Sequence, residues 1–481
     1  MNSQTVWQRT LSFLGGKPVI IETSSVQLTS DAGLLPMREF DEALGFTRRF
    51  ADALEDTRDA RYTTHSFLEM TRARVFGILA DYEDQNDHDA LRHDPIFKVI
   101  AGGSLAKTLA SQPTHSRFEN AIDIPSLFRL RDVLIDQFID SFDSPPGRLT
   151  LDIDTFDDPA HGQQQLVLFH GHYGQYQYQP RVITCAENDM VVMPCLLYGS
   201  APAALGAADD VAYLVERLRA VWPDIDLELR ADSGFAVPEM FDTCERLRLW
   251  YSIGYGMNSV LKRNSEDLLD KACVAYEETG IPQRQFTSFD YQARSWPHQR
   301  HTIVKCEVNA EGTNRRGVVT NRPGATLLPD ATYDDYVDRG ESENRNKELK
   351  CGLSTDRLSD HRYMANLFRL YLHVQAHNLL IRIRREIAAP PQPLPDDDGL
   401  PVEALSGRAR KQFANLRRRA DPLGEGHPAT WRTRLIKVAA EVVERARCIR
   451  VRLSGSWPYL SHYEALCTAA SAFARSQVQQ E

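Results

Sequence analysis

The stretch RLTLDIDTFD, at residues 148–157, alternates apolar and polar residues in the way that a half-buried β-strand does. Asp152 and Asp154 are two residues apart, so a strand directs both carboxylates to one face, while Leu151 and Ile153 fill the other. Neighbouring carboxylates repel each other unless a cation or hydrogen bonds offset the repulsion. The stretch therefore predicts a sheet strand and favours the hypothesis of a metal ion at its polar face.

The residues after this strand predict an α/β fold. VVMPCLLY (191–198) has the apolar run of a second strand, and residues 225–232 predict a further short strand. The spacing of apolar residues at 209–223 and at 237–249 predicts a helix before and after that short strand. This order of elements is typical of a mixed sheet with helices packed on it.

The rest of the chain divides by composition and periodicity. Apolar residues at three- and four-residue spacing predict a mostly helical region before residue 148 and a long amphipathic helix at 364–387. Residues 280–325 predict short antiparallel strands, which form a β-rich insertion. PPQPLPDDDG (390–399) has the composition of a linker.

Composition narrows the class of protein. The 481 residues suffice for about two to four compact units, and 42% hydrophobic with 25% charged residues is typical of a soluble globular protein. The net charge of −10 argues against a uniformly basic nucleic-acid binder, although residues 402–452 hold 13 Lys and Arg against 5 Asp and Glu. The 8 cysteines have no zinc-site spacing and indicate reduced thiols. Without a secretory signal or an unbroken apolar span, we expect a cytoplasmic protein with no membrane segment.

A second acidic position follows the short strand. In LELRADSGF (227–235), Asp232 ends the strand immediately before a serine and a glycine. The carboxyl end of a strand, ahead of a turn into a helix, is a common place for functional residues in sheets of this kind. It is also a common place for an aspartate that only caps the helix, so both interpretations stay open at this point.

A third acidic position lies in the polar segment YVDRGESENRNKELK (336–350). At about 100° per residue, a helix would bring Tyr336, Arg339, Glu343 and Lys350 within about 60° of one another. The alternative is a solvated helix in which Glu343 pairs with Arg339 and with Lys347. Two carboxylates on or after strands and one on a later helix would suit Mg²⁺, and two such ions support phosphoryl transfer.

The spacing of Tyr336, Arg339, Glu343 and Lys350 reproduces the Y-R-E-K signature of the DDE transposases related to insertion sequence 4. Other motifs extend the similarity, so that from about residue 28 to 385 the chain resembles the transposases of the insertion sequence 1380 family. These motifs are LTSDAGLLPMREF (28–40), DIDTFDDPAHGQQQ (152–165), HYGQYQYQP (172–180), RADSGFAVPE (230–239), VVTN (318–321), ENRNKELK (343–350) and MANLFRL (364–370).

The resemblance implies an RNase H-like (retroviral integrase-like) catalytic core with a β-rich insertion, flanked by helical N-terminal and C-terminal regions. It places the catalytic, metal-binding carboxylates at Asp154, Asp232 and Glu343, with Asp152 as an alternative first carboxylate. The implied cofactor is a pair of Mg²⁺ ions, or Mn²⁺. The implied contacts to DNA phosphates are made by Tyr336, Arg339 and Lys350, and Lys347 fits equally well as a phosphate contact or as a helix partner.

Periodicity and resemblance together predict the division of the chain. We expect a helical region for DNA binding or dimerisation (1–147), a first part of the core (148–250), the insertion (251–330), a second part of the core with the catalytic glutamate (331–388), a linker (389–401) and a basic helical region (402–481). Within the last region, RARKQ (408–412), LRRRA (416–420) and RARCIRVR (445–452) are candidate DNA contacts.

The expected function is that of a DNA transposase. It would bind the terminal inverted repeats of an insertion sequence as a homodimer in a synaptic complex, cleave the element ends and join them to target DNA. Two alternatives are a catalytically silent DNA-binding derivative and an RNase H-fold nuclease without strand transfer. The three acidic positions and both basic partners are intact, which argues against the silent derivative.

Overall fold

The computed structural model describes residues 7–13, 17–388, 416, 421, 423–424 and 426–478, without the side chains of residues 341 and 342. The expected linker (389–401) and the basic segments at 408–412 and 417–420 lie outside the described residues. Among the helices of the described ranges, none combines the length and the apolar character that crossing a bilayer requires.

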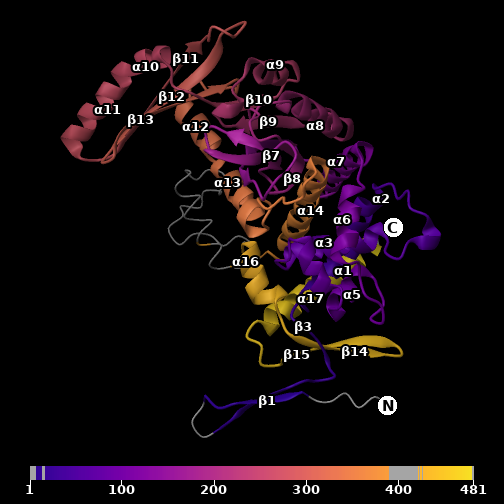
Figure 1. Cartoon of the computed structure of the whole chain (residues 1–481). Helices are drawn as coiled ribbons and strands as arrows, with labels where there is room; N and C mark the ends of the chain where they lie inside the picture. The colour runs from indigo at the N-terminus through magenta and orange to yellow at the C-terminus, as the bar shows by residue number, and fades with distance from the viewer. Residues whose placement is uncertain are drawn as a thin grey trace.

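A large mixed sheet forms the centre of the molecule, which confirms the predicted α/β class (Figure 1). Its middle strand is the one predicted from residues 148–157, and its neighbours are antiparallel on one side and parallel on the other. The strands are β4 (Arg148–Thr155), β7 (Gln175–Cys185) and β8 (Val191–Leu197) in antiparallel order, and β9 (Asp226–Ala231) and β10 (Trp250–Tyr255), which run parallel to β4.

The register of β4 and β9 brings two acidic positions to one edge of this sheet. Ile153 is opposite Ala231 in the parallel pair, and each is followed by an aspartate, Asp154 and Asp232. Leu149, Leu151 and Ile153 are buried as expected, but Thr150 and Asp152 are buried as well, so the strand is not half-buried as the alternation predicts. Because the carboxyl ends of parallel strands meet at the same edge, the two aspartates project from neighbouring strands.

Helices cover the sheet and connect its strands. The long helix α14 (Tyr363–Ile387), predicted from residues 364–387, packs against β8, and α9 (Pro238–Arg246) packs against β10 and α8 (Ala207–Val221). The helices of the N-terminal region and the shorter elements are α1 (Leu34–Leu44), α2 (Phe46–Asp52), α3 (Phe67–Leu79), α4 (His88–Leu91), α5 (Pro95–Ala101), α6 (Gln112–Asn120), α7 (Ile124–Ile139), β5 (Asp158–Pro159) and β6 (Leu168–His170), with 3-10 turns η1 (Ala60–Tyr62), η2 (Gln85–Asp87) and η3 (Ser233–Phe235).

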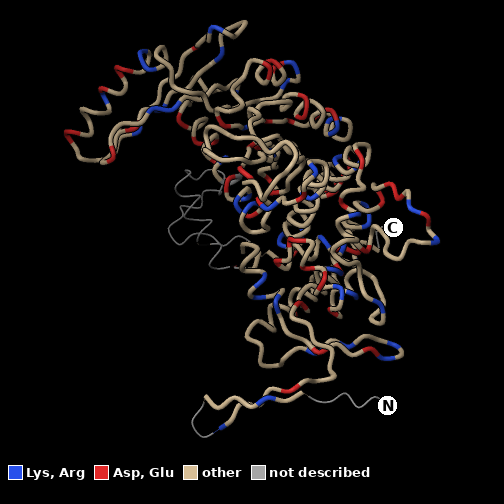
Figure 2. Tube along the Cα trace, in the orientation of Figure 1, with Lys and Arg blue, Asp and Glu red and all other residues tan. Residues whose placement is uncertain are grey.

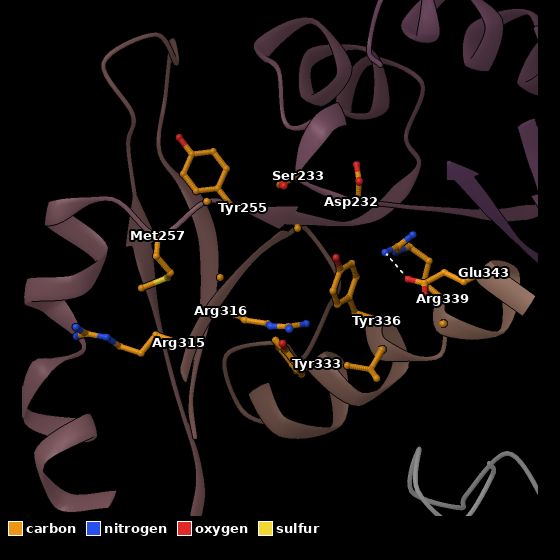
Figure 3. Close-up of a pocket in the computed structure, with 15 residues that line it drawn as sticks. Asp232, Ser233, Tyr255, Met257, Arg315, Arg316, Tyr333, Tyr336, Arg339 and Glu343 are labelled. Atoms are coloured by element: carbon orange, nitrogen blue, oxygen red, sulfur yellow. Dashed lines mark hydrogen bonds and ion pairs between the residues drawn. The ribbon is translucent and has the colours of Figure 1, made fainter. Parts of the chain in front are cut away.

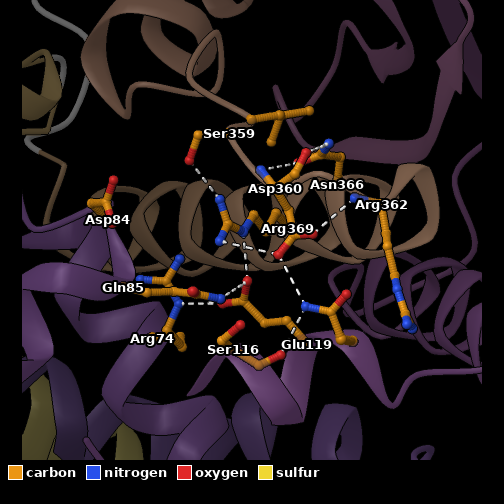
Figure 4. Close-up of polar contacts among 12 residues, drawn as sticks. Arg74, Asp84, Gln85, Ser116, Glu119, Ser359, Asp360, Arg362, Asn366 and Arg369 are labelled. Carbon is orange, nitrogen blue, oxygen red and sulfur yellow. Dashed lines mark hydrogen bonds and ion pairs between the residues drawn. The ribbon is translucent and has the colours of Figure 1, made fainter. Parts of the chain in front are cut away.

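A buried ionic cluster fastens the N-terminal helices to α14 (Figure 4). The carboxylate of Glu119 on α6 accepts hydrogen bonds from Arg74 on α3, at 2.8 Å, and from Arg369 on α14, at 2.5 Å. All three side chains are buried. Removing one partner of such a group leaves an uncompensated buried charge, so the cluster holds the two parts in one arrangement.

The predicted β-rich insertion extends the central sheet. Strands β11 (Gln283–Tyr291), β12 (Arg300–Asn309) and β13 (Gly312–Thr320) form an antiparallel ribbon, and β13 pairs with β10. The ribbon projects as an arm together with α10 (Ser259–Asn264) and α11 (Glu266–Thr279), at the upper left of Figure 1. Acidic positions are frequent along α11, as Figure 2 shows, and the adjoining β13 carries Arg315 and Arg316.

The polar segment 336–350 is not one helix, contrary to the prediction. It is divided among α12 (Pro329–Val337), α13 (Gly340–Lys347) and a π-helical turn, η4 (Glu348–Gly352). The break falls at Asp338 and Arg339, immediately before Gly340, where the low helix propensity of glycine favours a new start. The angles expected for a continuous α-helix therefore do not apply across the segment.

Strands also occur in the two terminal regions that we expected to be helical. The hairpin of β1 (Gln8–Leu11) and β2 (Val19–Glu22) lies apart from the body in Figure 1. Strand β3 (Gln27–Thr29) pairs with β14 (Ala440–Arg445), which pairs with β15 (Cys448–Leu453). The remaining C-terminal elements are α16 (Pro428–Trp431), a π-turn η6 (Arg432–Ile436) and α17 (Leu460–Val478), which packs on α1. The β3–β14 pairing joins opposite ends of the chain, so local periodicity did not reveal it.

Candidate active site

In both Asp154 and Asp232, one carboxylate oxygen accepts a hydrogen bond from a backbone N–H that is close in the sequence. Oδ1 of Asp154 accepts a hydrogen bond from the backbone N–H of Thr155 at 2.8 Å. Oδ1 of Asp232 accepts one from the N–H of Gly234, also at 2.8 Å, and so caps the short turn η3. The capping role considered for Asp232 is therefore real, and it leaves the second oxygen of that carboxylate for other partners.

Arg339 connects the strand edge to α13. Its Nη1 donates to Oδ2 of Asp154 at 3.3 Å, and its Nη2 donates to Oε1 of Glu343 at 3.3 Å. Asn346 donates a further hydrogen bond from Nδ2 to Oδ2 of Asp154, at 3.2 Å. The turn that interrupts the polar segment thus places one guanidinium between the carboxylates of Asp154 and Glu343. Figure 3 shows its contact with Glu343.

The electrostatics of Asp154 indicate that the acidic residues share one site. Burial raises the pKa of Asp154 to about 6, the Arg339 charge opposes this rise, and the charges of Asp232 and Glu343 add to it. A carboxyl that is both buried and repelled by two others is stabilised in its ionised form by an added cation.

Asp152 lies in a different environment although it shares a strand with Asp154. Its carboxylate is buried and accepts from Nε and Nη2 of Arg230, at 2.7 and 2.8 Å. Arg230 also donates to the backbone carbonyl of Asp335 at 2.7 Å. Both oxygens of Asp152 are therefore engaged by a bidentate ion pair that links β4, β9 and α12.

A cavity of about 530 Å³ opens beside the carboxylates. Figure 3 shows Asp232, Glu343, Arg339 and Tyr336 around it, together with Tyr333 and Arg316. The phenol of Tyr336 reaches so close to β10 that a Cβ at Gly254 would lie 2.6 Å from its Oη. Burial raises the pKa of this phenol, and the nearby Arg339 opposes the rise.

The two lysines of the polar segment differ in surroundings. Lys350, on the π-turn, lies with Nζ 2.5 Å from Oδ1 of Asp157. Lys347, at the end of α13, is exposed. The structure therefore brings Tyr336, Arg339 and Glu343 together at the cavity, puts Lys350 on the neighbouring Asp157, and leaves Lys347 toward solvent.

A group of polar residues around the buried Glu348 was missed in the sequence. Glu348 accepts from Arg345 at 2.9 Å and from Arg384 of α14 at 2.7 Å, and it lies 2.8 Å from Nδ1 of His427. Although its burial acts in the opposite direction, Arg384 and His427 lower the pKa of Glu348. The i, i+3 spacing of Arg345 and Glu348 was the one local signal, because their partners come from distant segments.

The carboxylate oxygens of this site are the donors that hard divalent cations such as Mg²⁺ prefer. In the described part of the chain, no group of three or more His, Cys, Asp or Glu side chains lies close enough together to hold a metal ion. The guanidinium of Arg339 is paired with both Asp154 and Glu343. The donor set fits a divalent cation in its chemistry, provided that Arg339 moves to another partner.

Comparison with known proteins identifies the family of the chain. No curated protein matches the chain. The family model described as "Transposase DDE domain group 1" matches residues 11–392, well over half of the 481 residues. The chain therefore belongs to the family of group 1 transposase DDE domains.

Proposed function

We propose that this protein is an insertion-sequence transposase that binds terminal inverted repeats, cleaves the element ends and joins them to target DNA by metal-dependent phosphoryl transfer. Family membership supports a transposase that acts on DNA. The observation that supports the reaction is that Arg339 bonds to both Asp154 and Glu343, while the charge of Asp232 adds to the rise in the pKa of Asp154. The Y-R-E-K spacing supports a place among the relatives of insertion sequence 4, in the insertion sequence 1380 family.

The proposed catalytic core is RNase H-like and consists of β4, β7–β10 and the helices packed on them. Support comes from the mixed sheet and from the acidic residues at the ends of two neighbouring parallel strands. In this proposal, the arm of β11–β13 is the insertion between the second aspartate and the glutamate.

Asp154, Asp232 and Glu343 are the proposed ligands of two Mg²⁺ ions, which Mn²⁺ can replace. Such ions activate the attacking oxygen and stabilise the leaving one. Asp152 is the less suitable first carboxylate, because both of its oxygens are engaged by Arg230. We assign Asp152 to the support of β4 and Asp154 to the reaction.

The cations of the site are the proposed phosphate contacts. Arg339 would exchange its carboxylate partners for a phosphate of the bound strand, since a guanidinium binds either group through the same paired N–H donors. Lys350 would support the strand from the Asp157 side, and Tyr336 would position it from the cavity. The exposure of Lys347 supports a contact with DNA.

The protein is proposed to act in the bacterial cytoplasm, at the nucleoid, as a homodimer in a synaptic complex. Two element ends must be joined to one target, which requires at least two copies of the site. The N-terminal region and the basic C-terminal region are the proposed contacts with the repeats.

Incubation of the purified protein with end DNA and Mg²⁺ tests the function. Wild type should nick and join the DNA, whereas Asp232→Asn and Glu343→Gln should bind it and fail at both steps. Glu278→Gln, an exposed position on α11, is the matched control and should retain both steps. Cleavage without joining would instead identify a nuclease, and binding alone would identify a silent derivative.

A further inference from the structure

The hairpin that follows β4 has no role in the proposed reaction. β6 pairs with the start of β7 through Leu168 and Gln177, Phe169 and Tyr176, and His170 and Gln175. Residues 171–174 form the turn, in which Gly174 has a φ of +66° and donates from its N–H to the carbonyl of His170 at 2.8 Å. This hydrogen bond closes the turn at the end of the hairpin.

An aromatic cluster occupies this end of the hairpin. The ring of Tyr173 lies 5.0 Å from the ring of His170 and 5.0 Å from that of His172, measured between centroids. The residue is nevertheless 40% exposed. Residues 166–180 contain no Lys, Arg, Asp or Glu, so this segment offers ring faces rather than charges.

One face of the hairpin adjoins the proposed active site. Gln175, the cross-strand partner of His170, donates from Nε2 to Oδ2 of Asp157 at 3.2 Å, and Asp157 is the partner of Lys350. Burial raises the pKa of Tyr173, and the charges of Asp157 and Asp154 add to the rise. Phe169 and Tyr176 form the next pair and therefore project from the opposite face.

We propose that Tyr173, flanked by His170 and His172, stacks on an unpaired base of the DNA strand held at the carboxylates. This inference rests on the proposed function. Arg339 and Lys350 would hold the phosphates, while an uncharged ring beside them suits the flat face of a base. A base inside a duplex has both faces covered, so the partner is a base at a strand end or next to a nick. A protein partner would need a surface of about 800 Å², far more than a single tyrosine and its two neighbours provide.

Fluorescence of 2-aminopurine tests the stacking directly. The probe is end DNA that carries this base at each of the last few positions beside the cleavage site in turn, bound in EDTA so that the strand stays intact. Wild type should quench the probe at one of these positions. Tyr173→Ala should lose the quenching and bind about 5- to 100-fold more weakly, whereas Tyr173→Phe and Tyr173→Trp should retain both.

Tyr176→Ala is the matched control, because Tyr176 belongs to the same hairpin, is 62% exposed and projects from the opposite face. It should quench and bind like wild type. An abasic residue at the quenched position should make wild type and Tyr173→Ala bind equally.

Two results would overturn the inference: quenching by Tyr173→Ala equal to that of wild type, or a binding loss that persists on the abasic DNA. If wild type nicks and joins DNA in Mg²⁺, either result contradicts the stacking but leaves the proposed function intact. A wild type that neither nicks nor joins contradicts the proposed function itself.

Discussion

Arg339 donates a hydrogen bond to Asp154 at 3.3 Å across 185 residues of sequence, from a turn between two helices to the edge of the sheet. Its second nitrogen reaches Glu343 at the same distance. Burial raises the pKa of Asp154 to about 6, the charges of Asp232 and Glu343 add to the rise, and the guanidinium opposes it. A divalent cation bound at these carboxylates would therefore compete with Arg339 for the same oxygens.

Removal of Arg339 should separate metal binding from catalysis. In the absence of DNA, Arg339→Ala should bind Mn²⁺ about 2- to 10-fold more tightly than wild type, because a competing positive charge beside the carboxylates is lost. Calorimetric titration with Mn²⁺ measures this effect. The same variant should cleave end DNA more slowly, because it would lack the proposed phosphate contact. Weaker Mn²⁺ binding by the variant would mean that Arg339 supports the metal site and does not compete for it.

The two aspartates of β4 should respond differently to the same substitution. Asp152→Asn leaves Arg230 buried without its ionised partner and should lower the free energy of unfolding by about 3–5 kcal/mol, as measured in urea. Asp154→Asn should keep or increase that free energy, because it removes a repelled carboxylate, but it should abolish cleavage. If Asp154→Asn retained cleavage and only Asp152→Asn lost it in folded protein, the first ligand would be Asp152.

Gly254 should be required for the position of Tyr336. In Gly254→Ala, the new Cβ would meet the Tyr336 Oη at 2.6 Å, so the ring must shift from its present position and cleavage should fall. Overpacking of this kind costs about 1–3 kcal/mol. Tyr336→Phe removes the clashing oxygen, so cleavage by Gly254→Ala/Tyr336→Phe should be no slower than by Tyr336→Phe alone. The measurement is the cleavage rate of wild type, of each single variant and of the double variant. If the loss in the double variant equalled the sum of the two single losses in free energy, the contact between Gly254 and Tyr336 would be contradicted.

The elements of the central sheet were predictable because their signals are local. Alternation in residues 148–157 and the apolar run at 191–198 predicted β4 and β8, and both are confirmed. The structure adds the register that puts Asp154 beside Asp232, which depends on pairing between distant strands.

Features that depend on distant partners were not predictable. The expected continuous helix at 336–350 is interrupted at Asp338 and Arg339, and there Arg339 bonds to Asp154, which is 185 residues away in the sequence. The π-turn at Glu348 is likewise held by Arg384, which belongs to another helix. The polar composition of this segment left a solvated helix as the alternative, yet Arg345, Asn346 and Glu348 are buried, since each finds a polar partner inside the protein.

Glu348 should be important for stability, because it fixes the segment that carries Glu343. Its carboxylate is buried and bonded to Arg345 and Arg384. Glu348→Gln leaves these guanidinium groups without an ionised partner and should lower the free energy of unfolding at pH 7 by about 3–5 kcal/mol. Glu278→Gln, at an exposed position, should change it by less than about 0.5 kcal/mol.

The destabilisation by Glu348→Gln should depend on pH. The pKa of Glu348 is lowered from 4.5 in the folded protein, so the unfolded chain takes up its proton first as the pH falls. The stability that the ionised carboxylate contributes is therefore complete above about pH 4.5 and decreases below it. The free energies of unfolding of wild type and Glu348→Gln, measured in urea and plotted against pH, should converge between about pH 5 and the lowest pH at which both still fold. A difference in free energy of unfolding that stays constant with pH would show that ionisation of Glu348 does not stabilise the fold.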